Sequence, residues 1–368
     1  NAKANYEDVF SQVRMWDTII FNELLKDNIV VPMRKIGSIQ AKELVGAYVK
    51  EPKTGFHEWV VSFDLNSLYP HLIMQYNISP ETILEGQKDI KISDLINKTV
   101  DTSDGNCVAA NGTMYRNDKQ GMLPRIIQKE YNARTIFKKK MLEAEQMYAN
   151  TKDKKYEKLA RKYYIVQHSK KISLNSAYGA IGNKYFRYYD HRQAEAITMS
   201  GQLNIKWIEK KLNEYFNKLY NTNDDYIIAS DTDSVYINMA PLVKMTGATD
   251  KVKIVKALDK FCKEKVEPYI ATVYKELADY MNVYQQKMEM AREVIADRGI
   301  WTAKKRYILN VHNSEGVQYP EPKLKIMGIE AVKTSTPLPC RDKLKECFKI
   351  LMNGDEKEMK EFCVNFRR

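Results

Sequence analysis

Two long helical stretches, residues 124–149 and 152–178, follow one another in the chain with only a polar break at Asn150 and Thr151 between them. Each stretch is rich in good helix formers, and the break is too short to hold a further element. The pattern therefore predicts a helical hairpin, which any fold of this chain has to accommodate.

The segments around this hairpin alternate between extended and helical patterns. Residues 56–64 are rich in aromatic and β-branched residues, which is typical of a strand. Short apolar runs on either side of Asp231-Thr232-Asp233 predict a β-hairpin. The order of elements indicates an α+β fold, an antiparallel sheet backed by helices with the helical hairpin inserted. We expect further helices over residues 13–28, 192–220, 254–281, 341–352 and 356–366, and strands over 225–230, 234–238 and 287–310.

The charge of the chain is unevenly distributed. The net charge is +12, and residues 129–171 alone contain 13 Lys and Arg against 5 Asp and Glu. Such a segment is compatible with a solvated helical face, or with a surface that binds nucleic acid or nucleotide phosphates. The hydrophobic content of 44% argues against a disordered chain, and no run of 18 apolar residues predicts a membrane span.

Three aspartates stand at the ends of predicted strands. Asp64 ends the strand at 56–64, whereas Asp231 and Asp233 lie at the tip of the predicted β-hairpin. Each alone is compatible with a cap or turn residue, but carboxylates that repel one another gather most readily around a bound cation. Oxygen ligands without Cys or His partners suit Mg²⁺, with Mn²⁺ as an alternative, and not Zn²⁺. Two such ions would support phosphoryl transfer.

Phosphoryl transfer also needs cations that bind phosphate, and the helical hairpin supplies them at helical spacing. Arg134 and Lys138 are four residues apart and share one helix face. On the second helix Lys171, Asn175 and Tyr178 follow one another at steps of four and three. An arginine offers a bidentate fork to a phosphate, and a lysine offers a point charge.

Six segments resemble, in the correct order, motifs of the family B DNA polymerases. Each segment alone is a moderate match, whereas six in order leave little room for chance. The match runs from about Trp16 to Thr336 and most resembles the T-even bacteriophage branch. The segments are VGAYVKEP (45–52, joining exonuclease to polymerase), FDLNSLYP (63–70, first motif), KISLNSAYG (171–179, second motif), DTDS (231–234, third motif), KKRY (304–307, primer-strand motif) and KLKIMGIE (323–330, the element after it).

The resemblance implies catalytic roles for the carboxylates. Asp64 and Asp233 would bind the two Mg²⁺ ions, with the backbone carbonyl of Leu65 as a further ligand. Asp231 would lie close by in a supporting role, and Glu293 matches an accessory acidic position near the metals. The implied reaction is attack of a primer 3′-hydroxyl on the α-phosphorus of a dNTP, which releases pyrophosphate.

The resemblance also implies which residues bind the substrates. The Tyr69 ring would lie under the sugar and exclude a 2′-hydroxyl, while Tyr178 and Gly179 would shape the pocket for the nascent base pair. The residues expected to bind the dNTP are Ser67, Leu68, Tyr69, Arg134, Lys138, Lys171 and Asn175, and those expected to contact the primer or DNA are Lys304, Arg306, Tyr307 and Lys325.

In domain terms, the resemblance implies a palm with inserted fingers. The expected ranges are 1–63 for a connector from an exonuclease region and the start of the palm, 64–128 for the first part of the palm, 129–180 for the fingers, 181–335 for the second part of the palm and 336–368 for the start of a truncated thumb. The implied partners are primer-template DNA and dNTPs, together with a sliding clamp and a single-strand binding protein that would contact regions outside this chain. The expected location is the cytoplasm, that of the host cell if the gene belongs to a phage.

Two other interpretations remain open from the sequence. A two-metal nuclease would also use three aspartates, but it would need neither Tyr69 as a sugar gate nor a basic helical hairpin. An inactive fragment that binds primer-template is the other alternative, because no acidic exonuclease motif precedes Asp64 and the match ends near the start of the thumb.

Overall fold

The structure is a computed structural model that describes residues 4–33 and 43–367, and the chain divides into two compact units. Unit 1 comprises Asn1–Ala47, Asn66–Asn204 and Tyr274–Met288, and unit 2 comprises Tyr48–Leu65, Ile205–Val273 and Glu289–Arg368. The boundary falls within two helices, α6 (His191–Tyr220) and α9 (Glu267–Tyr280). The predicted connector range 1–63 includes residues 1–3 and 34–42, and the predicted thumb range includes residue 368; these lie outside the described residues.

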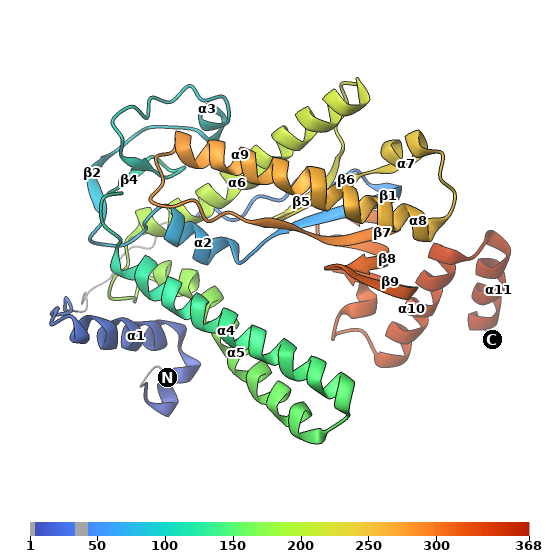
Figure 1. Ribbon diagram of the computed structural model, residues 1–368, viewed down its shortest axis with the longest axis horizontal. Helices are drawn as coiled ribbons and strands as arrows, with labels where there is room; N and C mark the ends of the chain where they lie inside the picture. The colour runs from blue at the N-terminus through green and yellow to red at the C-terminus, as the bar shows by residue number, and fades with distance from the viewer. Residues whose placement is uncertain (1–3, 34–42, 368) are drawn as a thin grey trace. The chain divides into compact units, whose positions relative to one another are not determined.

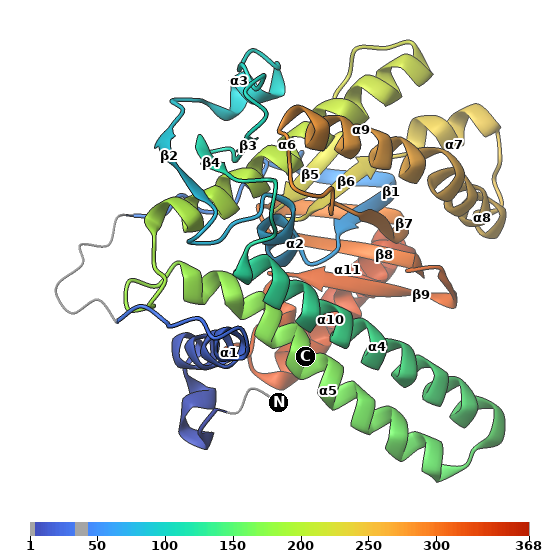
Figure 2. The ribbon, with the colours of Figure 1, turned by 60° about the vertical axis from the view of Figure 1, so that its left-hand side comes forward.

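A six-stranded sheet forms the centre of unit 2 (Figures 1 and 2). Every pair of neighbouring strands is antiparallel, as the sequence predicts. The strands lie in the order β5 (Ile227–Asp231), β6 (Ser234–Asn238), β1 (Gly55–Leu65), β7 (Met290–Ala303), β8 (Arg306–Ser314) and β9 (Val317–Met327).

Helices pack on this sheet through apolar and charged contacts, which confirms the α+β prediction. Helix α8 (Lys251–Phe261) contacts β7, where Lys251 Nζ lies 2.6 Å from an oxygen of the buried Asp297. Helix α10 (Leu338–Asn353) carries the buried Met352 into a cluster with Ile308 of β8. Helix α11 (Glu356–Arg367) follows α10.

The predicted helical hairpin is present in unit 1 as α4 (Met122–Thr151) and α5 (Lys154–Ile181), which lie side by side in Figures 1 and 2. The chain reverses at Lys152 and Asp153, two residues later than the break at 150–151 suggests. Lys152 adopts a left-handed conformation with φ of 58°, which ends α4, and the Asp153 side chain accepts a 2.8 Å hydrogen bond from the backbone N–H of Lys155.

Helix α1 (Gln12–Lys26) packs against α5 in the same unit. The indole Nε1–H of the buried Trp16 donates to the carbonyl of Ser173 at 3.2 Å and to Ser176 Oγ at 3.1 Å. Trp16 therefore anchors a helix near the N-terminus to the second helix of the hairpin.

Several elements were not predicted. Strand β9 contains Pro320 and Pro322, which interrupt its apolar residues, and prolines are tolerated there because β9 is an edge strand. The helix predicted over 254–281 contains a π-helical turn, Cys262–Val266, between α8 and α9. Also unpredicted are α2 (Leu68–Gln75), α3 (Ile92–Ile96), α7 (Ala240–Thr246), two 3-10 helices (Tyr6–Phe10 and Glu330–Val332) and a small antiparallel sheet of β2 (Ile83–Gln87), β4 (Thr113–Tyr115) and β3 (Cys107–Val108). No helix in the described ranges has both the length and the apolar character required to cross a bilayer.

Candidate active site

The predicted carboxylates of unit 2 lie at one end of its sheet. Asp64 is near the end of the central strand β1, opposite Ser234 of β6 and Ala291 of β7. The N–H of Leu65 donates to the carbonyl of Asp233 at 2.8 Å, so β1 ends beside the turn between β5 and β6. This pairing is the reason why residues more than 160 positions apart in the sequence share one edge of the sheet.

Negative charges are crowded at this end of the sheet, and this crowding changes the pKa values of the carboxylates. Burial, together with the charges of Asp233 and Glu293, raises the pKa of Asp64 to about 7 against the opposing effect of Lys325. Burial and the charge of Asp231 raise the pKa of Asp233 to about 6. The folded chain therefore disfavours negative charge on these two carboxylates unless a cation lies close to them.

Two lysines neutralise part of this charge. Lys305 Nζ lies 2.8 Å from Asp231 Oδ1, and Lys325 Nζ lies 2.7 Å from Glu293 Oε1. Ser62 Oγ, on β1, donates to the other oxygen of Glu293 at 3.3 Å. From the sequence, Lys325 was expected to contact DNA and Lys305 was given no role, although Lys305 lies within the KKRY segment that resembles the primer-strand motif.

The donor set fits a hard divalent cation, although the described residues contain no preformed cluster of metal ligands. Within residues 4–33 and 43–367, no three His, Cys, Asp or Glu side chains converge closely enough to hold a metal ion. The groups near Asp64 that shift its pKa are carboxylates and a lysine, with no thiol or imidazole among them. Mg²⁺ and Mn²⁺ prefer such oxygen ligands, and a bound cation would relieve the repulsion that raises the pKa of Asp64.

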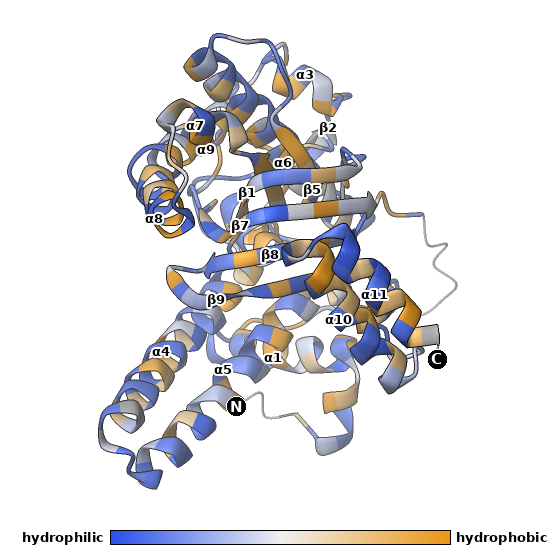
Figure 3. Cartoon of the chain, turned by 90° about the vertical axis from the view of Figure 1, so that its right-hand side faces the viewer, coloured by the Kyte–Doolittle hydropathy of each residue, from blue (hydrophilic) through white to orange (hydrophobic). Residues whose placement is uncertain are grey.

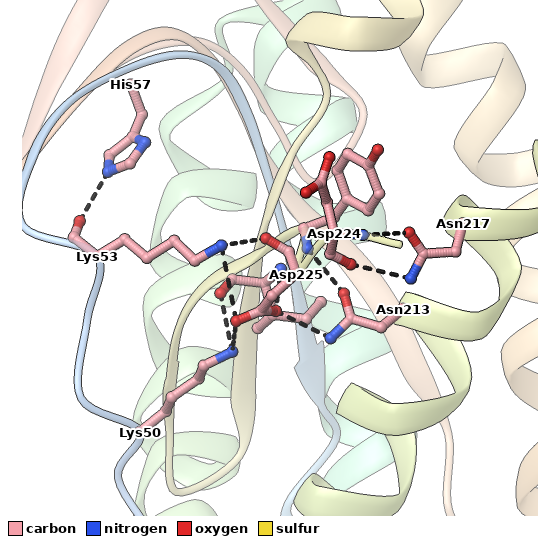
Figure 4. A network of polar contacts seen from close by, with 9 residues as sticks. Lys50, Lys53, His57, Asn213, Asn217, Asp224 and Asp225 are labelled. Atoms are coloured by element: carbon pink, nitrogen blue, oxygen red, sulfur yellow. Dashed lines mark hydrogen bonds and ion pairs between the residues drawn. The ribbon is translucent and has the colours of Figure 1, made fainter. Parts of the chain in front are cut away.

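The turn that carries Asp231 and Asp233 is braced from outside the sheet by residues 48–53. Thr232 N–H donates to the carbonyl of Tyr48 at 3.0 Å, and the N–H of Lys50 donates to Ser230 at 3.0 Å. At the other end of β5, Lys50 Nζ lies 2.7 Å from Asp225, which also accepts a hydrogen bond from Asn213 at 2.9 Å (Figure 4). These contacts cover the free edge of β5 and hold the turn in place.

The predicted DNA-contacting residues of unit 2 are engaged within the unit. Lys304 lies 3.0 Å from Glu51, and Arg306 makes two hydrogen bonds to Glu330, at 2.7 and 2.9 Å. Tyr307 is only 5% exposed, and its hydroxyl lies 2.6 Å from that of Tyr236. Contact of Lys304 and Arg306 with a phosphate would therefore require exchange of a carboxylate partner, and Tyr307 can present little of its surface.

The predicted nucleotide-binding residues lie in unit 1, on α2, α4 and α5. Arg134 of α4 donates from Nη1 to Ser67 Oγ, the N-cap of α2, at 3.2 Å. Its buried Nε has no hydrogen-bond partner among the described residues, so the guanidinium keeps unused donor capacity. Lys138 and Lys171 are exposed, and no described carboxylate lies within ion-pair distance of either.

The residues expected to contact the sugar and base also lie close together in unit 1. The rings of Tyr69 and Tyr178 are 4.7 Å apart between centroids, with their planes tilted by 35°. Leu68 is buried, and Asn175 and Gly179 are exposed on α5. A Cβ at Gly179 would lie 2.7 Å from Gln12 Oε1, so a larger residue there would have to displace that side chain.

Comparison with known proteins identifies the family. The model of DNA polymerase family B matches residues 10–367. This chain belongs to DNA polymerase family B. The chain is 37% identical to the DNA-directed DNA polymerase of Escherichia phage RB69, over 96% of this chain and 45% of that protein. It is also 37% identical to the DNA-directed DNA polymerase of Enterobacteria phage T4, over 100% of this chain and 47% of that protein.

A more distant relative shows how far the likeness extends within the family. The DNA polymerase of Pyrococcus glycovorans is 27% identical over 72% of this chain and 27% of its own length. The family B chain described here thus spans about half the length of the phage relatives that it matches.

Proposed function

We propose that this chain catalyses template-directed DNA synthesis, adding dNTPs to the 3′-hydroxyl of a primer. The observation that carries the proposal is the position of Asp64 at the end of the central strand, beside the Asp231-Thr232-Asp233 turn. Membership of DNA polymerase family B supports the assignment of nucleotidyl transfer to the carboxylates at this end of the sheet.

Family B DNA polymerases use divalent metal ions. In this chain the side chains of Asp64 and Asp233 and the carbonyl of Leu65 would hold them, with Asp231 and Glu293 in support. When bound, the ions supply an activated 3′-hydroxyl and charge neutralisation at the phosphates. Lys305 and Lys325 already offset part of the negative charge at this edge, so they tune how strongly it attracts cations.

The residues of unit 1 would bind the nucleotide. Arg134, with an unused donor, and the exposed Lys138 and Lys171 would bind the triphosphate, and Asn175 would contribute nearby. Ser67 and the backbone of Leu68 and Tyr69 lie at the N-terminus of α2, where N–H groups favour an anion. The Tyr69 and Tyr178 rings would contact the sugar and the base pair, beside Gly179.

The domain assignment follows as part of the same proposal. The antiparallel sheet with its helices would be the palm, and the α4–α5 hairpin would be the fingers. Lys304, Arg306, Tyr307 and Lys325 would line the path of the primer, and the ranges 1–63, 64–128, 129–180, 181–335 and 336–368 remain the proposed boundaries.

A primer-extension assay with Mg²⁺ and four dNTPs tests the proposal. We expect Asp64→Asn and Asp233→Asn to lower the extension rate roughly 1,000-fold or more, because loss of a metal-binding carboxylate removes several kcal/mol of transition-state stabilisation. Asp224→Asn is the matched control, because it makes the same change to an aspartate that lies just before β5. The side chain of Asp224 is exposed, and its hydrogen bonds to Asn217 are made by its backbone, which the substitution keeps. It should extend primers at the rate of the unmodified chain.

The same assay separates the alternatives. Shortening of the labelled primer in the absence of dNTPs, lost in Asp64→Asn, would identify a two-metal nuclease. Binding of primer-template without extension or degradation would identify an inactive DNA-binding fragment. Near-normal extension by either aspartate variant would overturn the assignment of these carboxylates to catalysis.

A further inference from the structure

The part of the α4–α5 hairpin around its turn is strongly basic. We call residues 138–162 the hairpin tip; it contains nine Lys and Arg against four Asp and Glu. Figure 3 shows this end of the hairpin mainly in hydrophilic colours. The nine cations are Lys138, Lys139, Lys140, Lys152, Lys154, Lys155, Lys158, Arg161 and Lys162, and all of them are exposed.

The cations of the hairpin tip differ from those at its base. At the base, Lys129 pairs with Glu23 and Lys170 pairs with Glu130, each at 2.7 Å. At the tip, by contrast, no described carboxylate lies within ion-pair distance of any of the nine cations. Paired charges are typical of a solvated helical face, whereas nine neighbouring unpaired cations produce a positive potential that attracts a polyanion.

Lys140 and Lys152 lie over the rings of Phe137 and Tyr148, but the positions of the other tip cations oppose the stability of the hairpin. Lys154 and Lys155 occupy the first turn of α5, where positive side chains oppose the helix dipole. Close like charges along a helix also repel, and the tip has consecutive lysines at 138–140 and at 154–155. Since no ion pair with a described carboxylate accounts for these positive charges, they point to a ligand.

An exposed aromatic stack on α5 indicates the kind of polyanion. The rings of Tyr164 and His168 are 5.3 Å apart and nearly parallel, at 13°, and both residues are exposed. Arg161 precedes Tyr164 by three residues, so the three side chains share one helix face. Alternating cations and aromatic rings bind single strands, because each unpaired base offers a face for stacking.

We propose that the hairpin tip, with Tyr164 and His168, binds single-stranded DNA at a site that shares only Lys138 with the triphosphate-binding residues. The tip spans about 20 Å of helix on α4 alone, from 138 to 151 at 1.5 Å per residue, which is far longer than a nucleotide triphosphate. The phosphates of a duplex could also bind the lysines. Its bases, however, are already stacked on one another and are not free to stack on Tyr164 and His168. The choice of DNA over other polyanions rests on the proposed polymerase function.

The test compares two triple variants in which three exposed lysines are replaced by glutamine. The tip variant is Lys154→Gln, Lys155→Gln and Lys158→Gln. The control is Lys253→Gln, Lys256→Gln and Lys260→Gln, which removes the same charge from the exposed face of α8. Fluorescence anisotropy of a labelled oligothymidylate measures affinity, and circular dichroism checks that each variant is folded.

We expect the tip variant to bind the oligothymidylate roughly 10- to 100-fold more weakly near 0.1 M salt. The slope of log affinity against log salt should fall by about 2, since each phosphate contact with a single strand contributes about 0.7. Tyr164→Ala should weaken binding roughly 5- to 100-fold without changing the slope, because stacking releases no counterions. Tyr6→Ala removes another exposed tyrosine and should leave binding unchanged.

Further measurements test the proposal independently of the polymerase assignment. Binding does not require extension, so Asp64→Asn should retain the full affinity for oligothymidylate. Equal losses in the tip and control variants, or equal losses for blunt duplex and single strand, would overturn the proposal. Competition by polyglutamate as strong as that by oligothymidylate would indicate an acidic polypeptide instead. A raised dNTP KM with unchanged single-strand affinity would assign the tip to the triphosphate.

Discussion

Tyr69 and Arg134, two residues of the proposed nucleotide site, are held by neighbouring side chains of unit 1. Tyr69 packs its ring against that of Tyr178, which limits the rotamers available to both. Arg134 is held by Ser67 through one nitrogen and retains a buried Nε without a partner in the described part of the chain. Side chains that are already ordered lose less entropy when a ligand binds, and the unused donor of Arg134 remains available to it.

Replacement of Tyr69 tests the sugar gate. Tyr69→Ala should raise the use of CTP relative to dCTP by roughly tenfold or more, because the volume that would exclude a 2′-hydroxyl is removed. Tyr69→Phe keeps the ring and should keep the discrimination. The measurement is the ratio of kcat/KM for dCTP and CTP in each protein, and an unchanged ratio in Tyr69→Ala would refute the gate.

Replacement of the hairpin cations tests the triphosphate site. Arg134→Ala and Lys171→Ala should raise the dNTP KM roughly 10- to 100-fold, the effect of losing a charge-assisted hydrogen bond, with little change in primer-template affinity. Lys170→Gln is the control, since Lys170 is adjacent in sequence but pairs with Glu130. Steady-state kinetics and a binding titration separate the two effects, and loss of DNA affinity with an unchanged KM would mean that these residues face DNA.

Among the elements, β7 shows how a strand is locked to its neighbours by a buried carboxylate. Asp297 is 3% exposed, and it lies 2.6 Å from Lys251 of α8 and 3.2 Å from His312 of β8. Asn310 of β8 donates to it at 2.9 Å. Against the effect of burial, hydrogen bonds from His312 and Lys251 lower the pKa of Asp297 from 3.8 to about 2.

This shift predicts how the stability of the sheet depends on pH. A carboxyl whose pKa is lower in the folded chain stabilises it above its unfolded pKa, so the contribution is full above about pH 4 and is lost as pH falls towards 2. Asp297→Asn should therefore lower the free energy of unfolding by about 1 to 2 kcal/mol at pH 6 and by much less near pH 2. Urea titrations at both pH values measure this difference. Asp279→Asn, an exposed partner of Lys275, should have little effect at either pH; a cost of Asp297→Asn that stays constant with pH would contradict the prediction.

In the molecule as a whole, the proposed site residues are divided between the two units. The carboxylates and the proposed primer contacts belong to unit 2, and the proposed nucleotide-binding residues belong to unit 1. The chain carries a net charge of +12, which favours association with a polyanion such as DNA.

The salt dependence of primer-template binding tests the proposed primer contacts. If Lys304, Arg306 and Lys325 each neutralise one phosphate, affinity should fall roughly 40-fold between 50 and 200 mM salt, since each contact contributes a slope of about 0.9. Lys304→Gln should reduce the measured slope by about 0.9. An unchanged slope would mean that Lys304 stays paired with Glu51 and does not reach the DNA.

Local patterns were sufficient to predict much of this protein from its sequence. The α4–α5 hairpin, the β5–β6 hairpin and the strand that carries Asp64 near its end were predicted because helical and alternating periodicities are properties of adjacent residues. The motif order was sufficient to predict the family, which the comparisons confirm. Strand β9 was missed because its prolines hide the alternation that marks a strand.

The tertiary structure decided which of these residues interact. The pairing of Asp231 with Lys305 and of Glu293 with Lys325, and the cover of β5 by residues 48–53, join segments far apart in the sequence. The raised pKa of Asp64 likewise depends on burial and on Asp233 across the sheet. Burial, ion pairing and charge repulsion depend on distances through space, which strand pairing establishes and sequence separation does not reveal.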